Sequence, residues 1–180
     1  MNICIALYKG KGRWHNGVVR DWTNSEYSHA ELILPDFTSI TIFPFSLKGV
    51  RREPFVEKSD KEWDYICVPV NPHQLSIIEN FYEKTKGQQY DWVGMLASQL
   101  VPFHIKHKDR WYCSEWIAYA LRLAGIGEGL YGESVMSPEV LSRLVPHATT
   151  YGKFSDVPTG TNWNNTWLEV NHFGPNDADK

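Results

Sequence analysis

The chain has 180 residues, of which 22% are charged, and its formal net charge is -3 at pH 7. This length suits one domain with a sizeable core and leaves little room for a second. The slightly acidic balance gives no general attraction to phosphate backbones, so nucleic acid is not expected as a partner.

The N-terminal stretch MNICIALYKGKG contains an apolar run that is too short for a signal peptide or a membrane span. We therefore expect no integral membrane segment and a cytoplasmic protein. The three cysteines, Cys4, Cys67 and Cys113, cannot all pair within one chain, and they lack the close spacing of a structural zinc site. We expect a reducing compartment and free thiols, with Cys4 and Cys67 as buried strand residues.

Strand patterns dominate the first 70 residues. The segment from His29 to Leu34 alternates, so that Ala30 and Leu32 share an apolar face while His29 and Glu31 share the opposite face. Pro35 and the residue after it form a turn into the next strand, which predicts a hairpin. The β-rich stretches, in chain order, are residues 2–8, 29–34, 38–45 and 62–70.

Helix patterns follow in the second half. Asn71 and Pro72 begin a helix that Gly87 stops. A helix starting near Ser114 is apolar on nearly every side, which is typical of a buried helix. The helical stretches are residues 72–86, 90–101, 114–124 and 137–145, and residues 13–22 form a short helix or an ordered loop. Periodicity then disappears, so we divide the chain into a domain at 1–147 and an irregular C-terminal tail at 148–180.

Cys113 has three interpretations: a small buried hydrophobic residue, a metal ligand or a nucleophile. It lies just before the buried helix, where unpaired N–H groups and the helix dipole favour a thiolate. A zinc site with His104 and His107 is disfavoured, because a fourth ligand is missing and two lysines lie beside the histidines. A nucleophile requires a histidine base, and His29 on the polar strand face is the candidate.

The ordered set YSHAELIL, KGVRREPF, YDWVG, WYCSEWIAYAL and SPEVL resembles the circularly permuted branch of the NlpC-type, papain-like cysteine hydrolases, with the YiiX-like permuted amidase group as the nearest likeness. The histidine strand precedes the cysteine helix here, as in that branch. The resemblance covers roughly residues 2–145. It implies an α+β fold in which an antiparallel sheet packs against a buried helix that carries the cysteine at its N-terminus.

Carried over to this sequence, the resemblance assigns Cys113 as nucleophile and His29 as base. The third residue departs from the pattern: the strand after the histidine offers Ser39 and Thr41, and Glu31 is the alternative on the histidine's own strand. The candidates for substrate contacts are Tyr90, Asp91, Trp111 and Tyr112, although a structural role is favoured for the Tyr90–Asp91 pair. No metal or other cofactor is implied.

The resemblance implies a thiol-dependent hydrolase that cleaves an amide or peptide bond through an acyl-enzyme. Its substrate is a peptide or an acyl amide, with peptidoglycan considered first. A phage-encoded protein would then reside in the host cytoplasm or the virion. The alternatives are a lipid or acyl amidase or acyltransferase of the same fold, and a non-catalytic binding protein whose Trp-bearing tail is the partner surface. Oligomeric state is left open.

Overall fold

The computed structural model describes residues 1–10, 26–43, 46–57, 61–91, 109–127, 140–141, 149–151 and 153–157. Several predictions lie outside these residues: the helix or loop at 13–22, nearly all of the helix at 90–101, and the tail beyond 157. His104 and His107 lie outside them too. Of the helix predicted at 137–145, Val140 and Leu141 are described, and both are helical.

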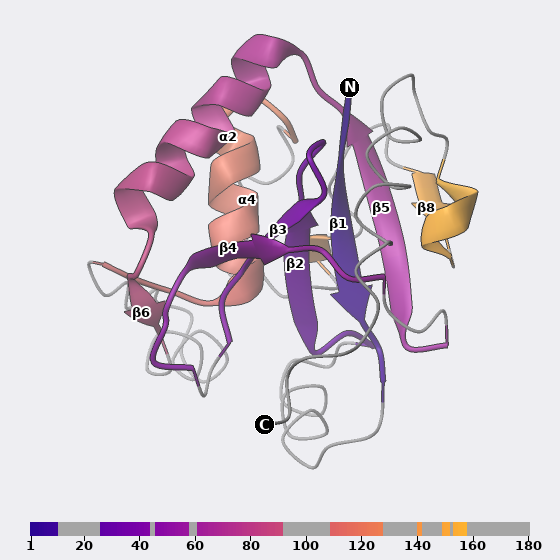
Figure 1. Ribbon diagram of the computed structural model, residues 1–180, viewed down its shortest axis with the longest axis horizontal. Coiled ribbons are helices and arrows are strands. Elements are labelled where there is room, and N and C mark those ends of the chain that lie inside the picture. Colours follow the sequence, from indigo (N-terminus) through magenta and orange to yellow (C-terminus); the bar gives the residue numbers. More distant parts are fainter. Residues whose placement is uncertain are drawn as a thin grey trace, which may run out of the picture.

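The centre of the fold is an antiparallel sheet of six strands in the order β4-β3-β2-β1-β5-β8 (Figure 1). Strand β1 lies in the middle and pairs with β2 on one side and β5 on the other. The strands are β1 (Asn2–Tyr8), β2 (His29–Ile33), β3 (Thr38–Thr41), β4 (Arg51–Pro54), β5 (Trp63–Pro69) and β8 (Thr149–Tyr151). The four β-rich stretches of the sequence are therefore confirmed as strands, and β4 and β8 were not predicted.

The predicted hairpin between β2 and β3 is present. Ile33 pairs with Ser39, and Leu34 N–H donates to the carbonyl of Thr38 across the turn. The Asp36 carboxylate accepts hydrogen bonds from the N–H and the hydroxyl of Thr38, which holds the turn closed. This turn sets the register of the two strands that carry the polar residues of the site.

Helix α2 (Pro72–Thr85) matches the predicted helix at 72–86. The Asn71 side chain accepts from the N–H of Gln74, and the Gln74 side chain accepts from the N–H of Asn71, so a capping box begins the helix. At the other end Gly87 has a φ of 82°, a left-handed conformation that glycine adopts without strain.

Helix α4 (Cys113–Leu123) is the predicted buried helix, and it packs with α2 against one face of the sheet (Figure 1). The apolar side chains of β1, β2 and β5 on this face form one core with those of the two helices. Its central members include Ile5, Leu32, Ile66, Ile78 and Trp116.

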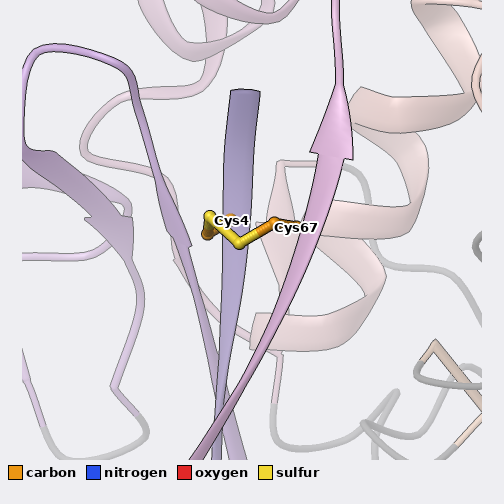
Figure 2. Close-up of a disulfide and its surroundings, with 2 residues drawn as sticks. All are labelled: Cys4 and Cys67. Atoms are coloured by element: carbon orange, nitrogen blue, oxygen red, sulfur yellow. A yellow bond between two sulfur atoms is a disulfide. The ribbon is translucent and has the colours of Figure 1, made fainter. Parts of the chain in front are cut away.

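The opposite face of the sheet carries a second cluster, which is rich in aromatic side chains and contains a disulfide. Cys4 and Cys67 are partners in the β1–β5 register and are bonded to each other, as Figure 2 shows. The prediction that all three cysteines are free thiols is therefore wrong for this pair; Cys113 is free. The sequence spacing of 63 residues gave no hint that the two positions face each other across neighbouring strands.

The beginning of the predicted irregular tail joins this second face. Strand β8 pairs with β5, and a 3-10 helix, η2 (Phe154–Asp156), follows it. The Phe154 ring lies 4.9 Å from the Phe55 ring and 5.2 Å from the Tyr65 ring, between centroids. Residues 149–151 and 153–157 thus lie against this face of the sheet, with Phe154 packed among its aromatic side chains.

Two short strands, β6 (Gln89–Tyr90) and β7 (Arg110–Trp111), form a separate parallel pair just before α4. Tyr90 therefore lies in a strand and not in the helix predicted from residue 90. The described residues give an α+β fold in which an antiparallel sheet is packed against two helices. None of the helices among them is both long enough and apolar enough to cross a bilayer.

Candidate functional site

Cys113 is the first residue of α4 and is 6% exposed. The N–H groups of Ala30 and Ser114 both donate to its sulfur, so a strand and the first turn of a helix converge on one atom. The first N–H groups of a helix have no partners within the helix, and the positive end of the helix dipole lies there. This position stabilises a thiolate.

His29 begins β2 and lies opposite Tyr8 of β1. Its side chain is hydrogen-bonded to Cys113. The imidazole stacks on Phe43 with 4.3 Å between ring centroids, and the edge of Trp63 approaches it at 6.3 Å. These two aromatic rings restrict the orientation of the imidazole and shield it from water, since only 6% of the residue is exposed.

Two oxygen atoms meet the Nε2 atom of His29. The Thr41 hydroxyl lies 3.2 Å from Nε2, and the Glu31 carboxylate lies 3.4 Å from the same atom. Because both contacts use Nε2, the nitrogen left for the Cys113 sulfur is Nδ1. The imidazole is thus held between the sulfur on one side and a hydroxyl and a carboxylate on the other.

The register of β2 and β3 explains why these two oxygens meet. Ile33 pairs with Ser39, so Glu31 and Thr41 lie two residues away from that pair, on the same face as His29. Ser39 lies beside Ile33, one step further from the imidazole along this face. The structure therefore brings both Thr41 and Glu31 to the histidine, where the sequence offered them as alternatives.

The pKa values of both His29 and Cys113 are shifted. Burial is the largest single influence on His29 and favours the neutral ring, but the hydrogen bonds and charges of Cys113 and Glu31 outweigh it and raise the pKa of His29 to about 9. Burial likewise acts to raise the pKa of Cys113, yet the hydrogen bond and charge of His29 and the two N–H donors lower that pKa below its usual value. Both shifts favour the thiolate–imidazolium form of the pair over the neutral form.

The predicted substrate-contact residues are all buried. Trp111 packs against Phe81 and Tyr119, at 5.4 Å and 5.3 Å between ring centroids, and its indole N–H donates to the Gln88 side chain. Asp91 N–H donates to the carbonyl of Trp111, which continues the short β6–β7 pair. Substrate contact stays a prediction for Trp111, Tyr112, Tyr90 and Asp91.

The buried hydroxyl of Tyr90 is electrostatically coupled to Cys113. Burial raises the pKa of its hydroxyl well above the usual value, and the charge of Cys113 acts in the same direction. The phenol therefore stays protonated within electrostatic reach of the sulfur.

Two contributors to the site were not predicted from the sequence. Phe43 and Trp63 enclose the imidazole, and both come from strand regions that the sequence treated as apolar β-structure. The signal was present in part, because Phe43 lies two residues after Thr41 and so shares its face. Nothing local in the sequence places Trp63, which reaches the site through the β1–β5 pairing.

Comparison with solved structures shows a likeness in fold. The structure is similar to the crystal structure of metalloprotein YiiX from Escherichia coli O157:H7 (DUF1105), with a TM-score of 0.53 and 17% identity, over 83% of this chain and 95% of that one. No family model matches the sequence, and no curated protein matches it either. At this identity the likeness concerns the fold alone, and it agrees with the YiiX-like resemblance at that level.

YiiX is described as a metalloprotein. Among the residues described here, no three side chains of His, Cys, Asp or Glu are grouped so that they could hold a metal ion.

Proposed function

We propose that this protein is a thiol-dependent hydrolase that cleaves an amide or peptide bond, with Cys113 as nucleophile and His29 as its acid–base partner. The observation that carries the proposal is the hydrogen-bonded Cys113–His29 pair, whose shifted pKa values favour the reactive thiolate. Thr41 and Glu31 act as positioning residues, because they hold the imidazole through Nε2.

We further propose that the fold is the circularly permuted papain-like arrangement of the NlpC type. Three features support it: the histidine strand precedes the cysteine helix, the cysteine begins that helix, and the helix packs against an antiparallel sheet. The likeness to YiiX extends over most of both chains and is consistent with this arrangement.

In the first half of the reaction the Cys113 thiolate attacks the carbonyl carbon, and the carbonyl electrons move to oxygen. Backbone N–H groups at the start of α4, including that of Cys113, are the proposed donors to that oxyanion. As the C–N bond breaks, the His29 imidazolium gives its proton to the departing amine. A thioester and a neutral imidazole remain.

In the second half, water attacks the thioester. Neutral His29 accepts a proton from the water, the C–S bond breaks, and the products are a carboxylic acid and the regenerated thiolate–imidazolium pair. Glu31 matters in both halves, because its carboxylate stabilises the positive charge each time His29 is protonated.

The substrate class that we favour is a peptide or acyl amide, with bacterial cell-wall peptides tested first. Acyl-lipid amides are the alternative substrates for the same chemistry, and a non-catalytic binding protein is the alternative from outside enzymes. One experiment separates them: purified protein is incubated with peptidoglycan, with peptide amides and with acyl-lipid amides, and the products are identified by mass spectrometry.

The variants Cys113→Ser and Cys113→Ala should lose turnover by at least about a thousandfold while keeping the melting temperature, because each removes the thiolate and little volume. The double variant Cys4→Ala/Cys67→Ala is the matched cysteine control and should keep the activity of the site. Full activity in Cys113→Ser would contradict the thiol mechanism, and no product from any of the three substrate classes with wild-type protein would favour the binding protein.

A further inference from the structure

A cationic side chain lies beside Phe43, the ring that stacks on His29. Arg51 lies in β4 directly opposite Thr41, so it shares the sheet face that carries His29 and Glu31. Its guanidinium carbon lies 5.0 Å from the centroid of the Phe43 ring, whose other neighbour is the imidazole of His29. Arg51 and His29 thus both contact the Phe43 ring, which brings a guanidinium close to the candidate site.

The guanidinium uses only one of its edges within the described part of the chain. Nε donates to one Glu53 oxygen at 2.9 Å, and Nη2 lies 3.5 Å from the other. Nη1 is buried and has no hydrogen-bond partner among the residues that the structure describes. A buried donor without an acceptor costs free energy, whereas an Arg fork has a second edge that suits a carboxylate or a phosphate.

A second buried donor lies next to the base. The Ser28 hydroxyl, immediately before His29 in the chain, is also buried without a hydrogen-bond partner among the described residues. Together with Nη1 of Arg51, this hydroxyl gives two buried donors without acceptors, and a bound molecule rich in oxygen atoms would satisfy them.

We propose that Arg51 anchors an anionic group of the substrate, a carboxylate or a phosphate, beside the Phe43 ring that also contacts His29. This deepens the proposed function, because it takes Cys113 as the atom that meets the substrate. It implies that the substrate carries a negative charge close to the scissile bond, as an acidic peptide or a phosphate-bearing amide does. Since Glu53 offsets the charge of Arg51, recognition depends on directed hydrogen bonds more than on a long-range field.

Alkylation of Cys113 tests the anchor without knowledge of the substrate. Three probes share one reactive group: N-iodoacetyl-β-alanine carries a carboxylate, N-iodoacetyl-β-alaninamide is its neutral counterpart, and N-iodoacetyl-O-phosphoethanolamine carries a phosphate. In each reaction the Cys113 thiolate displaces iodide and a C–S bond forms. Labelling rates at Cys113 are measured by mass spectrometry on the full chain.

We expect wild-type protein to react about tenfold faster with one anionic probe than with the neutral probe, the size of one charge-assisted hydrogen bond. Arg51→Gln should remove most of this preference. Arg52→Gln is the matched control: Arg52 is the next residue, its side chain donates to Thr38 and pairs with Asp36 and Glu79, and its loss should leave the preference unchanged. The faster anionic probe identifies the source, a carboxylate for acidic peptides or a phosphate for phosphate-bearing amides.

Equal rates for all three probes with wild-type protein would overturn the proposal, as would an unchanged preference in Arg51→Gln. If Arg51→Gln does not fold, Arg51→Lys gives the answer, because it keeps the charge but loses the fork and should lower the preference several-fold. A failure of the proposed function is distinguishable: it would appear as slow labelling of Cys113 by every probe, the neutral one included.

Discussion

The two faces of the central sheet are built from the same strands but differ in chemistry. On one face, Ile5, Leu32 and their neighbours pack against α2 and α4 in an apolar core. On the other face, residues one position away form a disulfide, an aromatic cluster and the polar group of His29, Glu31 and Thr41. A one-residue step along a strand therefore separates side chains that secure the fold from side chains that can react.

The two faces of the sheet are not fully separate in structure. Cys113 comes from the helix-covered side, yet it meets His29 of the other face at the end of β2, where the N–H of Ala30 reaches its sulfur. The proposed site thus lies where the two faces meet. The second face also holds the Cys4–Cys67 disulfide. On this face the disulfide lies toward one end of β1, and His29 lies beside the other end, opposite Tyr8.

Removing the disulfide gives the largest expected effect on the fold. Cys4→Ala/Cys67→Ala frees a loop of 63 residues in the unfolded chain and should lower the free energy of unfolding by roughly 4 kcal/mol. Urea denaturation of the variant, with wild-type protein in the absence and presence of reductant, measures this. The labelling rate of Cys113 should stay within about twofold in the folded variant. An unchanged free energy of unfolding would show that the second face does not depend on this bond for stability.

Glu31→Gln should affect the site more than the fold. It removes the anion beside His29, so the rate should fall by about 10- to 150-fold, the equivalent of roughly 1.5–3 kcal/mol. The pH–rate profile should also shift. An imidazolium without its carboxylate loses its proton more easily, so the pKa of His29 falls from about 9. The alkaline limb of the profile therefore moves to lower pH. Glu79→Gln, on α2, is the control and should keep the wild-type profile. A Glu31→Gln profile identical to that of wild type would remove Glu31 from the mechanism.

Thr41→Val should lower the reaction rate less than Glu31→Gln does. It deletes a neutral hydrogen bond to Nε2 and keeps the shape of the side chain, so the rate should fall somewhat less than tenfold, for a contribution of about 1 kcal/mol. Steady-state rates are compared with those of Ser39→Ala, which lies one step further along the same face and should stay within about twofold of wild type. If the steady-state rate falls more in Ser39→Ala than in Thr41→Val, Ser39 and not Thr41 is the residue that positions His29.

Much of this fold could be predicted from local patterns. Alternation in residues 29–34 placed His29 and Glu31 on one face, and the Asn71–Pro72 start and Gly87 stop defined α2. What failed depended on pairing between distant strands. Cys4 and Cys67 are ordinary strand residues until the β1–β5 register joins them, and Trp63 reaches His29 by the same pairing. The choice between Thr41 and Glu31 was undecidable locally, because the spacing of the two strands permits both contacts at once.

The order of these elements along the chain has a consequence for synthesis on the ribosome. His29, Glu31, Thr41 and Arg51 all belong to strands that emerge before α2, whereas Cys113 arrives only with α4. Until then the apolar face that includes Leu32 and Ile66 lacks the helix that covers it. The helix that brings Cys113 also closes the core, so the proposed Cys113–His29 pair cannot assemble before the core can form. A chain without α4 would leave this apolar face exposed to solvent, and we expect such a chain to aggregate or to be degraded by proteases.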